Sequence, residues 1–351
     1  MEGHETMTVQ NLKTPSTLQI HDESSLPSWL TKALCLAAVV MMFMPYLLDG
    51  KPFELRMLTI IFLYAVLGHG WNILGGYAGQ TSLGHGVFFG IGAYVDAILV
   101  SQFNWSPWIG MPVGALVASM VGVALGWPCF KLRGHYFVIA TLVLAESIFL
   151  LVNAWDDVGS AMGIQLPILK DGWKHVQFSH HKEGYYYLSL AMLVFVTILV
   201  AKIQASRFGY VLRAIRDDEA AVRSLGFSPE LYKQGAMAIS AGIVGLAGGF
   251  YTQYVLFVDP ASCLALSLSV TIALIAILGG VGTVAGPILG ACVLIPLSEY
   301  SRVWFSGSGR NLDLLIYGAL IMLISVKRPN GLYGIFIDMI KQKGDIHANR
   351  I

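Results

Sequence analysis

The sequence predicts an all-α, polytopic membrane protein of about ten transmembrane helices, interrupted in places by glycine-rich segments. Three observations lead to this prediction. Hydrophobic residues make up 56% of the 351 residues, and the mean hydropathy is +0.66. Only 12% of the residues are charged, about half of the share that is usual in soluble domains. Several apolar runs approach the roughly 20 residues that cross a bilayer core, and 38 glycines are distributed along the chain.

The apolar runs divide the chain into a membrane domain at 29–330 and two tails at 1–28 and 331–351. The first tail is acidic and lacks the basic region and short apolar core of a signal peptide. Within the membrane domain we expect a long external connection at 154–184 and a cytoplasmic loop at 204–233. The apolar runs predict spans at 30–48, 56–75, 86–103, 107–130, 134–153, 185–203, 234–257, 262–280, 285–300 and 311–326.

Lysine and arginine residues are distributed unevenly between the two sides of these spans. With both termini inside the cell, 15 of the 22 fall in inside segments and seven in outside segments. Positive residues are enriched in the cytoplasmic loops of membrane proteins. The distribution therefore predicts that both termini and the 204–233 loop are cytoplasmic.

Two glycine-rich segments interrupt the apolar pattern. Residues 74–86 contain five glycines among small and polar residues, and the glycines of 278–290 are spaced similarly. Glycine lowers helix stability, so we expect an interruption at 77–85 in place of one continuous helix. Paired interruptions in the two halves of a transporter often flank the pathway. Small-residue spacings at 242–248 and 286–290 predict close packing between helices.

Polar residues beside or inside the spans are the candidates for a substrate pathway. Four lie within the first glycine-rich segment, beside flexible backbone, and could hydrogen-bond a zwitterion. Two more are ionisable residues within apolar runs, where such residues either serve function or pair with a polar neighbour; both interpretations stay open here. The six candidates are Gln80, Thr81, Ser82, His85, Asp96 and Glu146.

No catalytic constellation is present in the sequence. It has no glycine-rich nucleotide loop, no His-Glu-x-x-His motif and no plausible Ser/His/Asp group. The four cysteines lie in or beside apolar runs and lack the spacing of metal ligands. We therefore expect a chain that is not an enzyme and binds neither a metal nor a cofactor. Energy for uphill transport must then come from an ion gradient or from a separate ATPase.

The 204–233 loop concentrates charged residues in a chain that has few of them. Gly226 and Pro229 bound a short helix predicted at about 217–225, whose acidic first turn complements the helix dipole. The small side chains of Ala220 and Ala221 would let this helix enter a groove on a partner protein. The alternative is a solvated loop that only sets the orientation of the chain.

Five stretches, in matching order, resemble the LivM-type permeases of branched-chain amino acid ABC importers. They are 71–94, 131–142, 209–226, 278–291 and 328–332. The resemblance therefore extends over nearly the whole chain. One departure concerns the loop: the family pattern has three residues between Glu-Ala-Ala and the glycine, whereas four separate Ala221 from Gly226. That difference leaves the register of docking open.

The resemblance implies a permease subunit that carries branched-chain amino acids into the cytoplasm by alternating access. It implies a LivH-type second permease, two cytoplasmic ATPases that use ATP and Mg²⁺, an external substrate-binding protein and the bacterial inner membrane, with no nucleic acid partner. It also implies that the loop couples the chain to an ATPase. The coupling residues would be Arg213, Arg216, Asp217, Asp218, Glu219, Ala220, Ala221 and Gly226.

Other functions remain possible at this point. Related permeases carry urea or short amides, and specificity in such systems resides largely in the binding protein. An ion-coupled secondary transporter would use Asp96 or Glu146 as its coupling site and would work without an ATPase. A membrane-embedded enzyme would need a clustered catalytic set, which the sequence does not contain.

Overall fold

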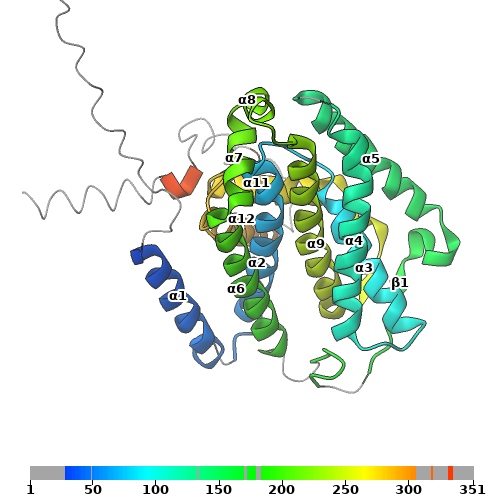
Figure 1. Cartoon of the computed structure of the whole chain (residues 1–351). Coiled ribbons are helices and arrows are strands. Elements are labelled where there is room, and N and C mark those ends of the chain that lie inside the picture. Colours follow the sequence, from blue (N-terminus) through cyan, green and yellow to red (C-terminus); the bar gives the residue numbers. More distant parts are fainter. Residues whose placement is uncertain are drawn as a thin grey trace, which may run out of the picture.

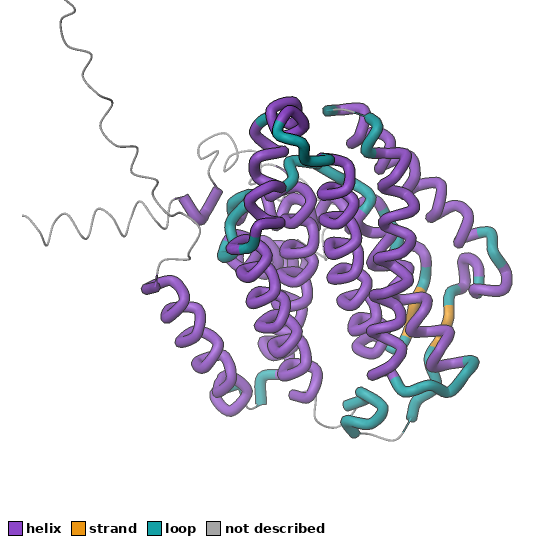
Figure 2. Tube along the Cα trace, in the orientation of Figure 1, coloured by secondary structure: helices purple, strands orange, loops and turns teal. Residues whose placement is uncertain are grey.

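The computed structural model describes residues 28–48, 50–132, 134–169, 172–178, 183–305, 318 and 331–334. Helices form nearly all of this part of the chain, and Figures 1 and 2 show them packed into one bundle. The long helices are α1 (Ser28–Leu47), α2 (Pro52–Trp71), α3 (His85–Ser101), α4 (Pro107–Cys129), α5 (His135–Asn153), α6 (Glu183–Ala205), α9 (Pro229–Val255), α11 (Leu266–Gly279) and α12 (Gly286–Phe305).

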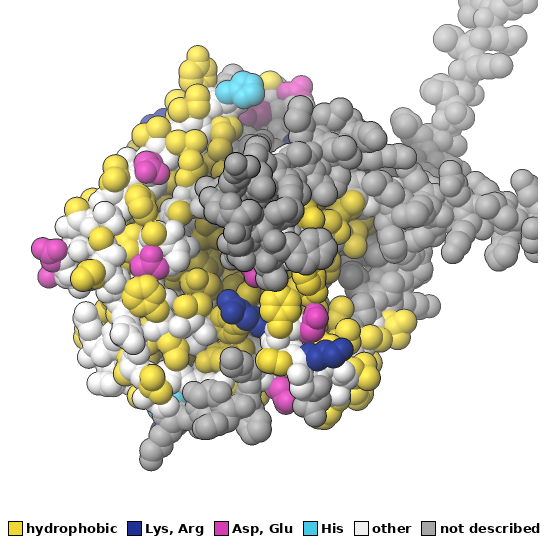
Figure 3. Space-filling view, turned by 180° about the vertical axis from the view of Figure 1, so that it is seen from behind, with side chains coloured by type: hydrophobic (Ala, Val, Ile, Leu, Met, Phe, Trp, Pro, Cys, Tyr) yellow, Lys and Arg dark blue, Asp and Glu magenta, His cyan; other side chains and the backbone are white. Residues whose placement is uncertain are grey.

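The helices have the composition of a membrane domain, which confirms the predicted fold class. Six segments among the described residues are long and apolar enough to cross a bilayer. Hydrophobic side chains cover much of the described surface, with few charged ones between them (Figure 3). The six are Pro52–Tyr77, Pro107–Cys129, His135–Asn153, Glu183–Ala205, Pro229–Val255 and Pro260–Gly279, and α3 is a shorter apolar helix. The predicted total of about ten is not confirmed, and the span at 311–326 lies outside the described residues.

Small residues let α3, α4 and α9 approach one another closely at the centre of the bundle. A side-chain carbon on Gly92 of α3 would overlap the carbonyl oxygen of Gly245 in α9, and one on Gly248 would overlap that of Phe89. A carbon on Gly114 of α4 would lie 2.8 Å from the carbonyl oxygen of Gly92. Close backbone approach of this kind is how membrane helices associate without a hydrophobic driving force. The close packing predicted for 242–248 is therefore confirmed.

The interruption predicted at 77–85 is also confirmed. Helix α2 continues into a π-helical turn, η1 (Asn72–Tyr77), after which residues 78–84 form no helix and α3 begins at His85. We call 78–84 the first connection. The second glycine-rich segment behaves similarly, because α11 ends at Gly279 and α12 begins at Gly286. Residues 280–285 are the second connection.

The two connections lie at the ends of helices and not halfway along them. From Pro52 to Tyr77 the chain has 26 helical residues, a length of about 39 Å at 1.5 Å per residue. This exceeds the roughly 30 Å of a bilayer core, so the first connection follows a segment long enough for a complete crossing. The charged helices α7 (Arg207–Asp217) and α8 (Glu219–Ser224) lie at the same end of the bundle, the top of Figure 1.

A short strand pair was not foreseen from the sequence. It joins β1 (Ile164–Gln165) to β2 (Phe257–Val258) in antiparallel register, with Ile164 opposite Val258. The predicted long connection at 154–184 is thereby attached to the end of α9. It also contains two short 3-10 turns, η2 (Asp156–Val158) and η3 (Ser160–Met162), while the predicted span at 262–280 is divided into α10 (Pro260–Cys263) and α11.

Candidate functional site

One asparagine ties η1, the turn before the first connection, to the second connection. Asn72 in η1 is buried, and its Nδ2 donates to the carbonyl oxygen of Thr283 at 2.9 Å. Its Oδ1 accepts from the backbone N–H of Gly282 at 2.8 Å. A side-chain carbon on Gly76 would overlap Asn72 Oδ1 and lie 2.7 Å from Gly282 N. The end of the helix formed by α2 and η1 is therefore held directly against the second connection.

Side chains from neighbouring helices hold the first connection from its other side. The indole Nε1 of Trp71 donates to the carbonyl oxygen of Ser82 at 2.8 Å. The backbone N–H of Leu83 donates to Thr141 Oγ1 of α5 at 3.2 Å. The N–H of Gly86 donates to Ser269 Oγ of α11 at 2.8 Å. Irregular backbone beside a membrane needs such partners because lipid supplies none.

Two of the predicted pathway residues are engaged within the protein. Ser82 is buried, and its Oγ accepts from the N–H of Gly84 at 3.2 Å. The ring of His85 is buried too, with Nε2 lying 2.8 Å from Ser240 Oγ. The Ser240 hydroxyl donates to the carbonyl oxygen of Gly70 at 2.7 Å, so His85 Nε2 must be the donor in their contact. In this conformation both residues stabilise the connection.

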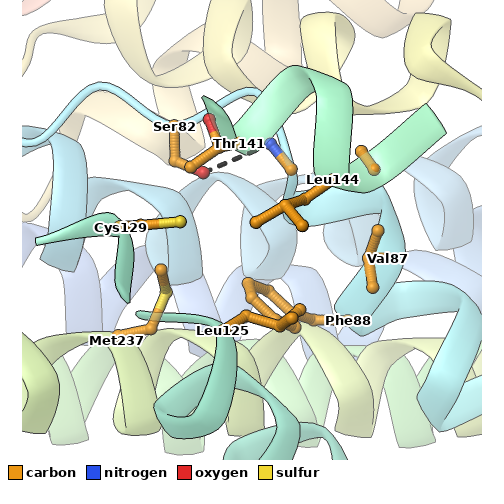
Figure 4. A pocket seen from close by; sticks show the side chains of 10 residues that line it. Ser82, Val87, Phe88, Leu125, Cys129, Thr141, Leu144 and Met237 are labelled. Atoms are coloured by element: carbon orange, nitrogen blue, oxygen red, sulfur yellow. Dashed lines mark hydrogen bonds between the residues drawn. The ribbon is translucent and has the colours of Figure 1, made fainter. Parts of the chain in front are cut away.

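The pocket beside Ser82 is too small for an amino acid. Its volume is about 20 Å³, enough for a water molecule. Figure 4 shows Ser82 and Thr141 at one side of this pocket and the apolar side chains of Phe88, Leu125 and Met237 at the other. Thr81, by contrast, is exposed, and Gln80 is half-buried.

The two ionisable pathway candidates have different surroundings. Asp96 in α3 is fully buried, and its Oδ2 accepts a 2.6 Å hydrogen bond from Gln253 Nε2 of α9. Asp96 Oδ1 packs against Gly110 of α4. Of the two roles left open for Asp96, a functional group or a partner of a polar neighbour, the structure shows the second, a hydrogen bond between α3 and α9. Glu146 in α5 is exposed at the surface of the chain, among the exposed side chains of Ile139, Val143 and Leu150.

The charged loop folds into two helices with well-defined ends. Ser206 caps α7 by accepting from the N–H of Gly209 at 3.3 Å. Asp218 caps α8, because its Oδ1 accepts from the N–H groups of Ala220 at 2.8 Å and Ala221 at 3.1 Å. Aspartate at this position is a favoured helix cap. Helix α8 confirms the predicted short helix, with bounds slightly inside 217–225.

The predicted coupling residues are divided between exposed and inward-facing positions. Ala220 and Ala221 are exposed on α8, and Gly226 follows with a positive φ of 87°. Arg213 donates to the carbonyl oxygen of Gln204 at 3.2 Å, and its guanidinium lies 4.7 Å from the ring centre of Tyr210. The guanidinium of Arg216 donates to the carbonyl oxygen of Gly76. Arg216 also lies 3.5 Å from the carboxylate of Asp217.

An ion network attaches α8 to the start of α9. Lys233 Nζ lies 2.7 Å from Glu219 Oε2, and the Lys233 side chain is only 4% exposed. Arg223 bridges Glu219 at 3.2 Å and Glu230 at 2.5 Å. Burial raises the pKa of Glu219, but the hydrogen bonds and charges of Lys233 and Arg223 outweigh it and leave the pKa below its ordinary value. Lys233 was not among the site residues expected from the sequence. Its position directly before the apolar run at 234–257 was the one sequence feature that could have drawn attention to it.

Replacing Glu219 by glutamine should destabilise the protein in a pH-dependent way. The pKa of Glu219 is lower in the folded protein than in the unfolded chain. The ionised carboxylate therefore stabilises the fold fully at pH values above the unfolded-state pKa, and this stabilisation is lost as the pH falls through the folded-state pKa. We expect Glu219→Gln to cost about 2 kcal/mol at neutral pH, since it leaves a buried ammonium without its charge partner. The difference in thermal unfolding midpoint from wild type, measured in detergent, should shrink in acid.

Glu230→Gln is the matched control for this prediction. Glu230 is 44% exposed, and its ion pair among the described residues is with the half-exposed Arg223, so we expect a loss below about 1 kcal/mol. Equal losses in the two variants, or a loss for Glu219→Gln that does not change with pH, would contradict the assigned network.

A cleft joins the charged loop to the first connection. It has a volume of about 680 Å³ and is lined on one side by α8 and on the other by Gln80 and the start of α5. Among the predicted pathway residues, Gln80 alone lines this cleft. Its lining residues are Gln80, Leu132, Gly134, Asp217, Asp218, Glu219, Ala220, Arg223, Ser224 and Lys233.

The described residues form a polytopic helical bundle in which two connections lie beside a charged, capped loop, and these features define a polytopic membrane protein. The chain belongs to the family described as branched-chain amino acid transport system / permease component, whose model matches residues 54–325. It is 31% identical over 323 residues to the high-affinity branched-chain amino acid transport system permease protein LivM of Escherichia coli (strain K12), covering 85% of this chain and 74% of the relative.

Two further relatives place the chain in the same group. The LivM permease of Salmonella typhimurium is 30% identical over 329 residues, which cover 87% of this chain and 75% of the relative. The permease LivH of Escherichia coli (strain K12) is 23% identical over 286 residues, covering 77% of this chain and 91% of the relative. No solved structure matches the chain. The predicted resemblance to LivM-type permeases is therefore confirmed.

Proposed function

We propose that this chain is the non-catalytic permease subunit of an ATP-driven importer of branched-chain amino acids. The observation that carries the proposal is helix α8, which exposes Ala220 and Ala221 next to a cleft that reaches the first connection. Small side chains on a capped, outward-facing helix suit insertion into a groove of a partner protein. The similarity to LivM permeases supplies the substrate class.

The proposal includes the other subunits of the importer. A LivH-type permease would complete the pathway, two cytoplasmic ATPases would bind ATP and Mg²⁺, and an external binding protein would deliver the amino acid. The similarity of this chain to both LivM and LivH supports a pair of related permeases. Glu146 supports an interface on α5, since an ionisable group in an apolar span is costly in lipid and calls for a polar partner.

Uptake by the reconstituted complex tests the function. The chain should be co-expressed with a LivH-type permease, two ATPases and a binding protein from the same organism, and the complex should be placed in vesicles with ATP inside. We expect ATP-dependent uptake of leucine that disappears when the ATPases are omitted. Uptake of urea or acetamide in place of leucine would contradict the substrate class. Ion-driven leucine uptake without the ATPases would contradict the importer and favour a secondary transporter.

We propose that the loop and both termini are cytoplasmic and that the protein resides in the inner membrane. The test uses Leu225, which is 76% exposed directly after α8. In a variant without the native cysteines, Leu225→Cys should resist a membrane-impermeant maleimide in intact cells and react with it after permeabilisation. A cysteine at Trp105, which is 46% exposed after α3, should react from outside. Strong labelling of Leu225→Cys in intact cells would reverse the orientation.

A further inference from the structure

Arg216 points its side chain into the protein although it belongs to the charged loop. It lies in the last turn of α7, and its Nη1 donates to the carbonyl oxygen of Gly76 in η1 at 3.0 Å. The two residues are 140 positions apart in the sequence. Its side chain is 40% exposed, so more than half of its surface is covered.

Glycines from both connections make room for this side chain. A side-chain carbon on Gly79 would lie 2.6 Å from Arg216 Cγ, and one on Gly282 would lie 3.0 Å from Arg216 Nη1. Both glycines have positive φ angles, 68° and 78°, a conformation that other residues rarely adopt. Arg216 therefore occupies a site formed jointly by the first connection, the second connection and η1.

The position of Arg216 links the loop to the ends of four helices. The first connection joins α2 to α3, the second joins α11 to α12, and Asn72 binds the second connection to η1. Gly76 belongs to a π-helical turn, a type of turn that occurs frequently at functional sites. On the other side of Arg216, the next element along the chain is α8, capped by Asp218.

We propose that Arg216 is the residue through which movement of α7 and α8 reaches the two glycine-rich connections. The inference rests on the proposed function, in which an ATPase engages α8. Displacement of α8 shifts α7, and the guanidinium transmits that shift to the carbonyl of Gly76 and to the glycines around it. Arginine suits this role because its planar fork is rigid and always charged. Arg216 is thus a positioning residue for transport and makes its contacts inside the chain.

The experiment compares uptake with ATP hydrolysis in the complete reconstituted complex. Arg216→Gln keeps a polar side chain but loses the charge and the reach to Gly76. We expect the variant to co-purify with the ATPases and to hydrolyse ATP, while leucine uptake falls roughly tenfold, as expected for loss of one charge-assisted hydrogen bond. The amount of leucine transported per ATP should fall by the same factor. Arg216→Lys keeps the charge and one donor and should restore part of this ratio.

Arg207→Gln is the matched control. Arg207 begins the same helix and is exposed, and its side chain has no hydrogen bond or ion pair with the described residues. It should keep the wild-type ratio of uptake to hydrolysis. An unchanged ratio in both Arg216→Gln and Arg216→Lys would overturn the proposal. Loss of the ATPases from Arg216→Gln would overturn it as well and make Arg216 a docking residue. Failure of the wild-type chain to bind an ATPase would instead count against the proposed function.

Discussion

Ala221→Glu should abolish both co-purification with the ATPase and amino acid uptake, while membrane insertion and folding stay intact. Ala221 is exposed on α8, so a glutamate side chain at this position can extend into solvent in the isolated chain. In the docked complex it would bring bulk and an uncompensated charge into the interface. A charge buried without a partner costs about 3–5 kcal/mol, which corresponds to more than a hundredfold loss of affinity.

The test is a detergent pull-down and an uptake assay on the same preparations. Ala205→Glu is the matched control, because Ala205 is exposed at the last residue of α6 and lies outside the proposed docking helix. It should retain the ATPase and transport normally. Normal association and normal uptake in Ala221→Glu would disprove docking through α8. Loss of membrane insertion in Ala221→Glu would show that the residue is needed for folding.

Asn72→Ala should destabilise the fold and should also stop transport. It removes both partners that join η1 to the second connection and leaves Gly282 N–H and Thr283 O without them. Each buried group left unpaired costs about 1–3 kcal/mol. Both groups are only partly buried, so we expect the free energy of unfolding to fall by about 2 kcal/mol in total.

Thermal unfolding in detergent measures this loss. Asn153→Ala is the control, since Asn153 is exposed at the last residue of α5 and makes no hydrogen bond among the described residues. Its unfolding midpoint should stay close to that of wild type. If Asn72→Ala unfolds at the wild-type temperature and transports normally, the two connections do not depend on each other.

The interrupted helices could be predicted from the sequence because glycine acts locally. Five glycines within 74–86 weaken a helix whatever surrounds them, and the structure has its break at 78–84. The helix α8 was predictable for a similar reason. An aspartate, a glutamate and a bounding Gly-x-x-Pro segment are local signals for the start and end of a helix.

The partners of the polar side chains could not be predicted in the same way. Ser82 and His85 lie in a glycine-rich segment. The same sequence pattern is expected whether these side chains contact a solute or hydrogen-bond to the protein, so it cannot distinguish the two roles. The structure gives them Gly84 and Ser240 as partners. Arg216 was grouped with the docking residues because it lies among charges, and only the fold brings Gly76 beside it. The contacts of His85 with Ser240 and of Arg216 with Gly76 are long-range, and a local pattern contains no information on them.

The joint between Asn72 and the second connection has a consequence for synthesis of the protein. Its two halves are separated by 210 residues, which a ribosome adds in roughly 10–40 s at about 5–20 residues per second. During that interval α2 and η1 have already been synthesised, while the second connection, which supplies the partners of Asn72, has not yet been translated. Asn72 must then rely on water or on the insertion machinery for its hydrogen bonds. Ribosome pausing between the two segments should therefore lengthen the period in which the nascent chain is exposed to membrane proteases.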